Sequence, residues 1–208
     1  MRQQSPKEEY FNTLTHGLGF LLSLVGFALL FVFQKYDTPQ GIMGISLYGI
    51  SLSALYLAST LYHLEKNELR KANFRKLDHI SIYLLIAGTY SPVVLITLEH
   101  SLGWTLFWVV WGIAALGTIL KIFFTGRFET ISLLLYLVMG WLIVFDLSAL
   151  QAAVDSNGLL LLLGGGIAYT AGIVFYVIDK IPYNHVIWHL FVLCGSMLHY
   201  FFIFFEVI

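Results

Sequence analysis

The chain has 208 residues, of which 59% are hydrophobic and only 11% are charged, and its formal net charge is -1 at pH 7. Soluble domains carry about 25% charged residues, and a water-soluble fold of this length could not hide so much apolar surface. The near-neutral charge offers no basic excess for nucleic acid, and a single cysteine, Cys194, can form no disulfide within the chain.

Seven apolar stretches follow one another along the chain, each close to the length of about 20 residues that a helix needs to cross a bilayer. None alternates apolar and polar residues over about 10 positions, as a membrane β-strand would. No small-residue cleavage site follows the first stretch, so we interpret it as a retained helix and not as a signal peptide. The predicted helices are Thr13–Phe33, Ile42–His63, Asp78–Leu98, Trp104–Phe124, Ile131–Leu150, Leu159–Ile178 and His185–Val207. We therefore expect one domain, residues 1–208, folded as an all-α membrane bundle of seven transmembrane helices.

The basic residues predict the orientation of this bundle, because cytoplasmic loops retain Lys and Arg. Only Lys35 falls on one side of the predicted membrane. The other side carries Arg2, Lys7, Lys66, Arg70, Lys71, Arg75, Lys76, Lys121, Arg127 and Lys180. The N-terminus is therefore expected in the cytoplasm and the C-terminus outside, with the chain in the inner or plasma membrane of the cell.

Three further features are interpreted from their position in this topology. The segment Glu65–Leu77 is basic and amphipathic, and we expect it to be a connector lying along anionic headgroups. Pro92 should kink the third helix, because proline cannot donate a backbone hydrogen bond. Asp146 lies near the outer end of the fifth helix, from where its carboxylate is expected to reach the interface.

Ionisable groups inside membrane spans are costly and mark candidate functional sites. The second helix runs inward and ends at His63, while the third begins at the same side with Asp78. The seventh helix begins there with His185 and His189. Three helices therefore bring three histidines and one aspartate to the same depth, near the cytoplasmic face.

The residue types at this depth are those of a metal site. His185 and His189 are four residues apart, which places both imidazoles on one helix face, and Ser59 has the same spacing from His63. Three histidines with one open position are typical of catalytic zinc. Asp78 could be a fourth ligand or could bond the water at the metal; alternatively, it could simply cap the third helix.

The other histidines are interpreted more simply. His79 and His100 are expected to be interfacial residues at helix ends. His199 lies ten residues beyond His189, roughly 15 Å deeper in the membrane. That depth excludes it from the same ion, so we expect a buried hydrogen-bonding residue.

Several motifs occur in a characteristic order along the chain. They are Glu9-x-x-Asn12-x-x-Thr15-His16, Ser59-x-x-x-His63, Lys76-Leu77-Asp78, Gly88-Thr-Tyr-Ser-Pro92 and His185-x-x-x-His189. In this order the set resembles the progestin and adipoQ receptor family, specifically its bacterial haemolysin III-like branch, over essentially the whole chain.

The resemblance implies a seven-helix, barrel-like bundle with a topology opposite to that of G-protein-coupled receptors. It implies a zinc ion held by His63, His185 and His189, with Asp78 approaching it through a water and Ser59 close by. The wider superfamily contains ceramidases. The bacterial branch is linked to membrane-lipid homeostasis and, by name, to haemolysis.

Three functions remain open at this point. The first is a zinc-dependent hydrolase of a lipid amide or ester that enters from the membrane, in which Asp78 accepts a proton from the attacking water and Ser59 orients that water or the oxyanion. The second is a non-enzymatic membrane sensor or regulator with structural zinc. The third is a haemolysin-like pore or transporter, although no ladder of charges crosses the bilayer. Turnover of a defined lipid, with and without chelator, would discriminate among them.

Overall fold

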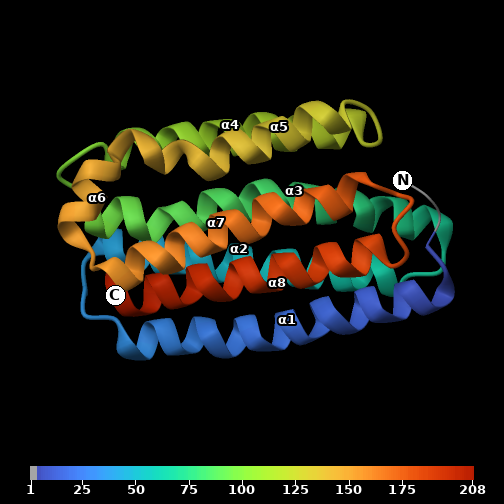
Figure 1. Cartoon of the computed structure of the whole chain (residues 1–208), viewed down its shortest axis with the longest axis horizontal. Helices are drawn as coiled ribbons and strands as arrows, with labels where there is room; N and C mark the ends of the chain where they lie inside the picture. Colours follow the sequence, from blue (N-terminus) through green and yellow to red (C-terminus); the bar gives the residue numbers. More distant parts are fainter. Residues whose placement is uncertain (1–3) are drawn as a thin grey trace.

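The computed structural model describes residues 4–208, which form an all-α bundle with seven spans long and apolar enough to cross a membrane (Figure 1). Arg2, counted above among the basic residues, lies outside the described part. The helices are α1 Pro6–Phe33, α2 Pro39–Leu64, α3 Glu68–Pro92, α4 Gly103–Phe124, α5 Glu129–Trp141, α6 Leu147–Ala153, α7 Ser156–Val177 and α8 Asn184–Phe202. Short π-helical or 3-10 segments extend three of them: η1 Val93–Thr97, η2 Leu142–Asp146 and η3 Ile203–Val207. The predicted seven-helix membrane fold is confirmed.

Helix α1 begins about two turns before the apolar stretch that predicted it. The hydroxyl of Ser5 accepts a hydrogen bond from the Glu8 backbone N–H, and the Glu8 carboxylate accepts one from the Ser5 backbone N–H. This capping box, with Pro6 in the first turn, satisfies the backbone donors at the start of the helix. The added turns are polar, and they bring Glu9 and Asn12 to the end of the bundle where α2 terminates.

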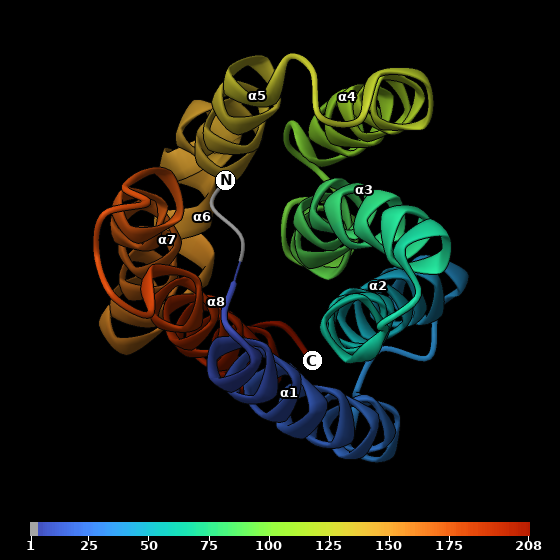
Figure 2. The ribbon, with the colours of Figure 1, turned by 90° about the vertical axis from the view of Figure 1, so that its right-hand side faces the viewer.

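The helices form a ring around an interior space, as the end-on view shows (Figure 2). Helices α1, α2 and α3 pack tightly in succession, and α8 packs against both α1 and α7. Helix α5 makes far sparser contact with α3, α4 and α7. The ring is therefore continuous on the α1, α2 and α8 side and loosely closed at α5.

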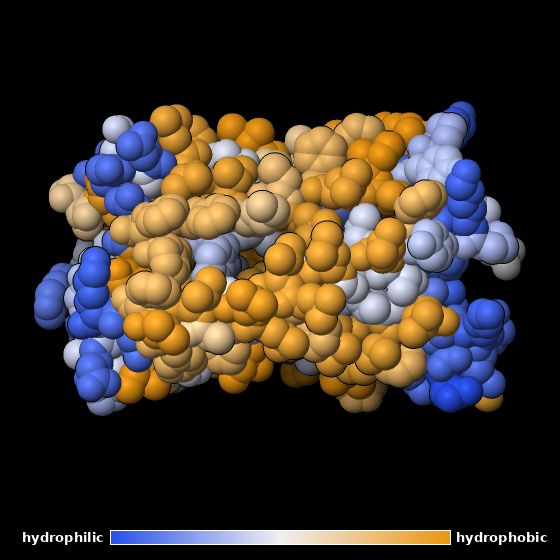
Figure 3. Space-filling view, turned by 90° about the horizontal axis from the view of Figure 1, so that it is seen from below, coloured by the Kyte–Doolittle hydropathy of each residue, from blue (hydrophilic) through white to orange (hydrophobic). Residues whose placement is uncertain are grey.

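The face of the bundle that Figure 3 shows is apolar over its middle and hydrophilic at both ends. Large side chains such as Val32, Trp108 and Phe123 are mostly exposed on it. Contiguous apolar patches of this extent mark membrane or protein contact in soluble proteins. On spans of this length they face the hydrocarbon of a bilayer.

One end of the bundle, here called the basic end, is formed by the start of α1 and the connections α2–α3, α4–α5 and α7–α8 (Figure 1). All the described Lys and Arg residues except Lys35 belong to it.

The structure corrects the prediction for the connection between α2 and α3. Helix α3 begins at Glu68 and not at Asp78, and Asn67 caps it by accepting from the Arg70 backbone N–H at 3.1 Å. Asp78 therefore lies within α3 and is not its cap.

Two other polar predictions have different outcomes. The regular α-helix of the third span ends at Pro92 and continues as the π-helical segment η1, while the kink expected at this proline stays a prediction. The prediction for Asp146 is wrong. Its side chain is buried and accepts hydrogen bonds from the Ser101 hydroxyl at 2.7 Å and the Leu102 backbone N–H at 2.9 Å. It therefore satisfies donors just before α4 and does not reach out to the interface.

Candidate metal centre

Three buried histidines converge near the basic end of the bundle. His63 is in the last turn of α2, and His185 and His189 are in the first two turns of α8. One ligand nitrogen from each lies within 4.8 Å of the others. Because bonds of about 2.1 Å from two nitrogens to zinc allow at most about 4.2 Å between them, small ring rotations would let all three reach one ion.

The hydrogen bonding of His63 fits such an ion. Its Nδ1 lies 2.6 Å from Oε2 of Glu9. A carboxylate accepts, so Nδ1 carries the proton and Nε2 keeps its lone pair. Nε2 is buried and has no hydrogen-bond partner among the described residues. A buried polar atom left unpaired costs free energy, and a metal ion would supply the missing partner.

A small cavity of about 30 Å³ lies beside the histidines, large enough for one or two waters. His185 and His189 form part of its wall, together with Ser59 of α2 and Asp78 of α3. The Ser59 hydroxyl is buried and makes no hydrogen bond of regular geometry to another described residue. Two of the three predicted metal ligands and both predicted catalytic residues therefore line one water-sized space, and His63 completes the cluster of ligand nitrogens beside it.

Helix α1 contributes a fourth histidine to this region, which the sequence reasoning did not single out. The His16 ring stacks on the His189 ring, with centroids 3.5 Å apart and planes 9° apart. His16 is buried and lines the same small cavity, and neither of its ring nitrogens has a hydrogen-bond partner within residues 4–208. Its spacing from Glu9 and Asn12 on one face of α1 was the available signal, but α1 had been predicted to start only at Thr13.

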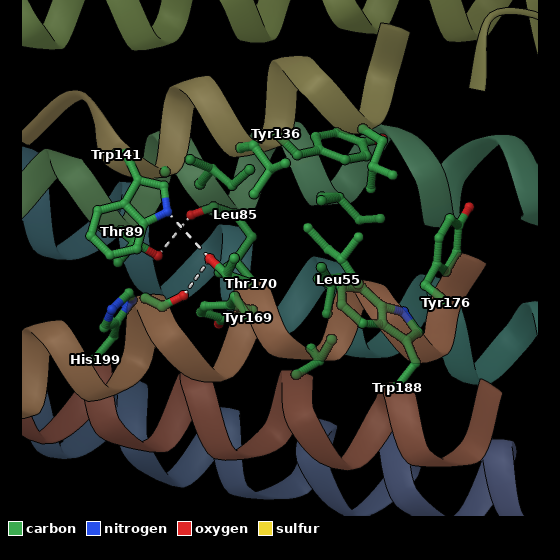
Figure 4. Close-up of a pocket in the computed structure, with 18 of the residues that line it drawn as sticks. Leu55, Leu85, Thr89, Tyr136, Trp141, Tyr169, Thr170, Tyr176, Trp188 and His199 are labelled. Atoms are coloured by element: carbon green, nitrogen blue, oxygen red, sulfur yellow. Dashed lines mark hydrogen bonds between the residues drawn. The ribbon is translucent and has the colours of Figure 1, made fainter. Parts of the chain in front are cut away.

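A much larger apolar space adjoins the small cavity. It consists of two connected parts of about 120 and 250 Å³, lined by α2, α3, α5, α6, α7 and α8 and by segments η1 and η2. Tyr176 and Trp188 lie at its end near the histidines, and Trp141 and His199 lie at the other end of the view (Figure 4). Tyr176 and Trp188 also line the small cavity. The small cavity beside the histidines is therefore adjacent to a long apolar compartment.

His199 and His79 do not belong to the cluster of ligand nitrogens. His199 Nε2 lies 3.1 Å from the Leu162 carbonyl oxygen, which confirms the predicted buried hydrogen bond. The interfacial prediction for His79 is wrong, because the side chain is buried. Its Nδ1 lies 3.8 Å from a Glu129 oxygen that also pairs with the buried Lys121 at 2.6 Å. This second ionic group joins α3, α4 and α5, and His79 also lines the small cavity beside the histidine centre.

These features define a class of protein: a seven-helix membrane bundle with a buried three-histidine centre and an apolar compartment beside it. Residues 4–200 match the model of the haemolysin-III-related family, and the chain belongs to that family. It is 45% identical over 206 residues to Hemolysin-3 of Bacillus cereus, covering 99% of this chain and 94% of the relative.

Two further relatives place the family more widely. The chain is 43% identical over 203 residues to the Hemolysin-3 homolog of Bacillus subtilis (strain 168), with 97% and 95% of the two chains covered. It is 32% identical over 196 residues to the human Monocyte to macrophage differentiation factor, with 91% and 80% covered. The resemblance stated from the motifs is thereby confirmed.

Proposed function

We propose that this chain is a zinc-dependent hydrolase that cleaves an amide or ester bond of a membrane lipid at the cytoplasmic face. One observation carries the proposal: a buried three-histidine centre, in which Nε2 of His63 has no partner among the described residues, adjoins a small cavity that shares wall residues with a long apolar cavity. A polar metal centre at one end of an apolar cavity could bind the carbonyl group of a lipid whose acyl chain occupies that cavity. The nine described basic residues at this end support the cytoplasmic placement.

The protein's own residues divide the chemistry between them. When bound, zinc polarises a carbonyl and lowers the pKa of water towards 7. Asp78 accepts the proton of the attacking water, because its carboxylate lies on the wall of the same small cavity. The Ser59 hydroxyl, which lies on the wall of the same cavity, orients that water or donates to the developing oxyanion.

The lipid reaches the centre from within the bilayer. Helix α5 contacts α3 and α7 sparsely, and the apolar cavity is lined by these helices. An acyl chain lies along this cavity, with its carbonyl between Trp188 and the histidines. Burial of the chain, at about 0.8 kcal/mol per CH₂, holds the scissile bond in place.

A catalytic zinc explains the arrangement better than a structural one. Structural zinc is normally closed by four protein ligands. Here three histidines adjoin a cavity that could admit water and substrate. The name of the two Bacillus relatives, hemolysin, fits a lipid hydrolase as well as a pore, because loss of bilayer lipid also lyses cells.

The proposal is tested by turnover. We expect the purified protein to release fatty acid from at least one member of a panel of ceramides, phospholipids and acylglycerols in nanodiscs. A chelator should abolish release, and added zinc should restore it, because the metal polarises the carbonyl. Absence of release across the panel, from protein that has bound zinc, would favour the non-enzymatic sensor.

Acyl-chain length provides a sharper prediction about the cavity. Gly166 lies where its two parts meet, and a side chain added there would meet Trp141 at an ordinary 3.5 Å. Gly166→Leu should therefore fold but block the far part. We expect release from long-chain lipids to fall by on the order of 10-fold or more, while short-chain lipids are affected little.

Gly112→Leu is the matched control, since Gly112 is exposed on α4 with open space around it and lines none of the described cavities. The measurement is the rate of fatty-acid release for a series of acyl-chain lengths, compared between the two variants. An equal loss at every chain length in Gly166→Leu would mean that the acyl chain does not lie in this cavity.

A further inference from the structure

Helix α1 supplies no metal ligand, yet it contacts two of the three ligand histidines. Glu9 Oε2 is 2.6 Å from Nδ1 of His63, and the Thr15 hydroxyl oxygen is 3.3 Å from Nδ1 of His189. In both cases α1 meets the ring nitrogen that is remote from a metal bound at Nε2. The polar face of α1 therefore contacts the ligand histidines through Nδ1 and leaves Nε2 for the ion.

The donors and acceptors in these two contacts select the same tautomer. The Glu9 carboxylate can only accept, so His63 donates from Nδ1. The Thr15 hydroxyl has its proton engaged by the backbone carbonyl of Phe11 at 2.9 Å or of Asn12 at 3.0 Å. It therefore accepts from Nδ1 of His189. Each contact leaves Nε2 with a free lone pair, the state that a metal requires.

Glu9 is itself held by a second partner. Its other oxygen, Oε1, lies 2.7 Å from Nζ of Lys71 on α3, and that ammonium lies over the Tyr62 ring, 5.3 Å from its centroid. The Glu9 and Lys71 side chains are only 21% and 22% exposed. Both carboxylate oxygens are thus engaged, and one side chain joins α1, α2 and α3 beside His63.

We propose that Glu9 is a positioning residue for the metal centre, with Lys71 fixing its carboxylate and Thr15 playing a weaker, analogous part for His189. This inference rests on the proposed metal function of the three histidines. Glu9 holds the His63 ring in the orientation and tautomer that direct Nε2 to the ion, so the free protein is already arranged for binding. Thr15 contributes less because it is neutral and its contact is longer.

The alternative is a purely structural ion pair that joins α1 to α3. In that case Glu9 would contribute to the stability of the metal-free protein and not to its affinity for zinc. The two roles differ in a measurable way, because zinc affinity compares bound and free states of a folded chain, whereas unfolding of the metal-free protein involves no ion.

The experiment measures the Kd for zinc by competition with a chelator, using the full chain in detergent or nanodiscs. Glu9→Gln is the informative variant, because an amide has one acceptor oxygen and cannot serve both His63 and Lys71. We expect zinc to bind 10- to 100-fold more weakly, the usual cost of losing an outer partner of a ligand histidine. Lys71→Met and Thr15→Val should weaken binding in the same direction but by less.

Glu68→Gln is the matched control, since it makes the same chemical change at an exposed position at the same end of the bundle, and its Kd should equal that of the wild type. The thermal unfolding of each metal-free variant is recorded in parallel. A lower unfolding temperature for Glu9→Gln with an unchanged zinc Kd would overturn the positioning role and leave the metal centre standing.

Two other results are also decisive. If the wild type binds no zinc, the metal centre and the positioning role both fail. If Glu9→Gln cannot be obtained as a monodisperse protein, Lys71→Met becomes the test: a Kd that matches the Glu68→Gln control overturns the proposal, and a raised Kd supports it.

Discussion

Replacing His63, His185 or His189 with alanine is expected to reduce zinc from close to one ion per chain to almost none. Each residue provides one of three ligand nitrogens in the cluster, and two imidazoles from a three-ligand set hold zinc poorly. The variants should also lose the thermal stabilisation that bound metal provides. Elemental analysis of purified protein, with protein concentration measured in parallel, gives the occupancy.

His199→Ala is the matched control for this prediction. His199 lies ten residues beyond His189 on α8 and bonds the Leu162 carbonyl, so its removal should leave zinc in place. Acidification should release zinc from the wild type, because ligand histidines must be neutral and protons compete as the pH falls. A variant series in which His199 governs occupancy and His63 does not would refute the proposed ligand set.

Asp78→Asn is expected to retain near-normal zinc but to lose lipid hydrolysis by on the order of 10²–10⁴-fold, the contribution typical of a general base. The substitution preserves the shape of a side chain that lines the small cavity and removes the oxygen that accepts a proton. The three histidines are unchanged, so the ion keeps its protein ligands. Zinc content and fatty-acid release are measured on the same preparation.

The outcomes of this paired measurement separate the hypotheses. Full zinc with unchanged hydrolysis would exclude Asp78 as the base. If function instead follows zinc content across the histidine and Asp78 variants, with Asp78→Asn fully functional, the metal is structural. Ser59→Ala should retain zinc as well, since this substitution leaves the three histidine ligands in place.

Depth along the membrane normal was predictable from the sequence for the residues of the centre. Each apolar stretch has the length of a span, and each residue of a helix advances it by about 1.5 Å. His63 ends one span, and His185 and His189 begin another at the same side. The motifs also indicated the family, which residues 4–200 confirm.

Helix boundaries at the polar ends were less predictable. Hydropathy locates apolar stretches and not the helices themselves, so the polar first turns of α1 and α3 were missed. The position of Glu9 was missed for the same reason, because its contact with His63 depends on the first turns of α1. Asp146 was misplaced for a different reason, because its donors, Ser101 and Leu102, come from a distant part of the chain.

The rotation of each helix about its axis was decided only by the tertiary structure. In water an apolar stripe shows which face of a helix points inward, but lipid is as apolar as the interior, so the inward face of a membrane helix has no such signature. The stacking of His16 on His189, the pairing of Glu9 with His63, and the long cavity beside the centre all depend on those rotations. The amino-acid sequence alone thus determined the membrane depth of the candidate ligands, whereas close packing of the helices determined which side chains face them.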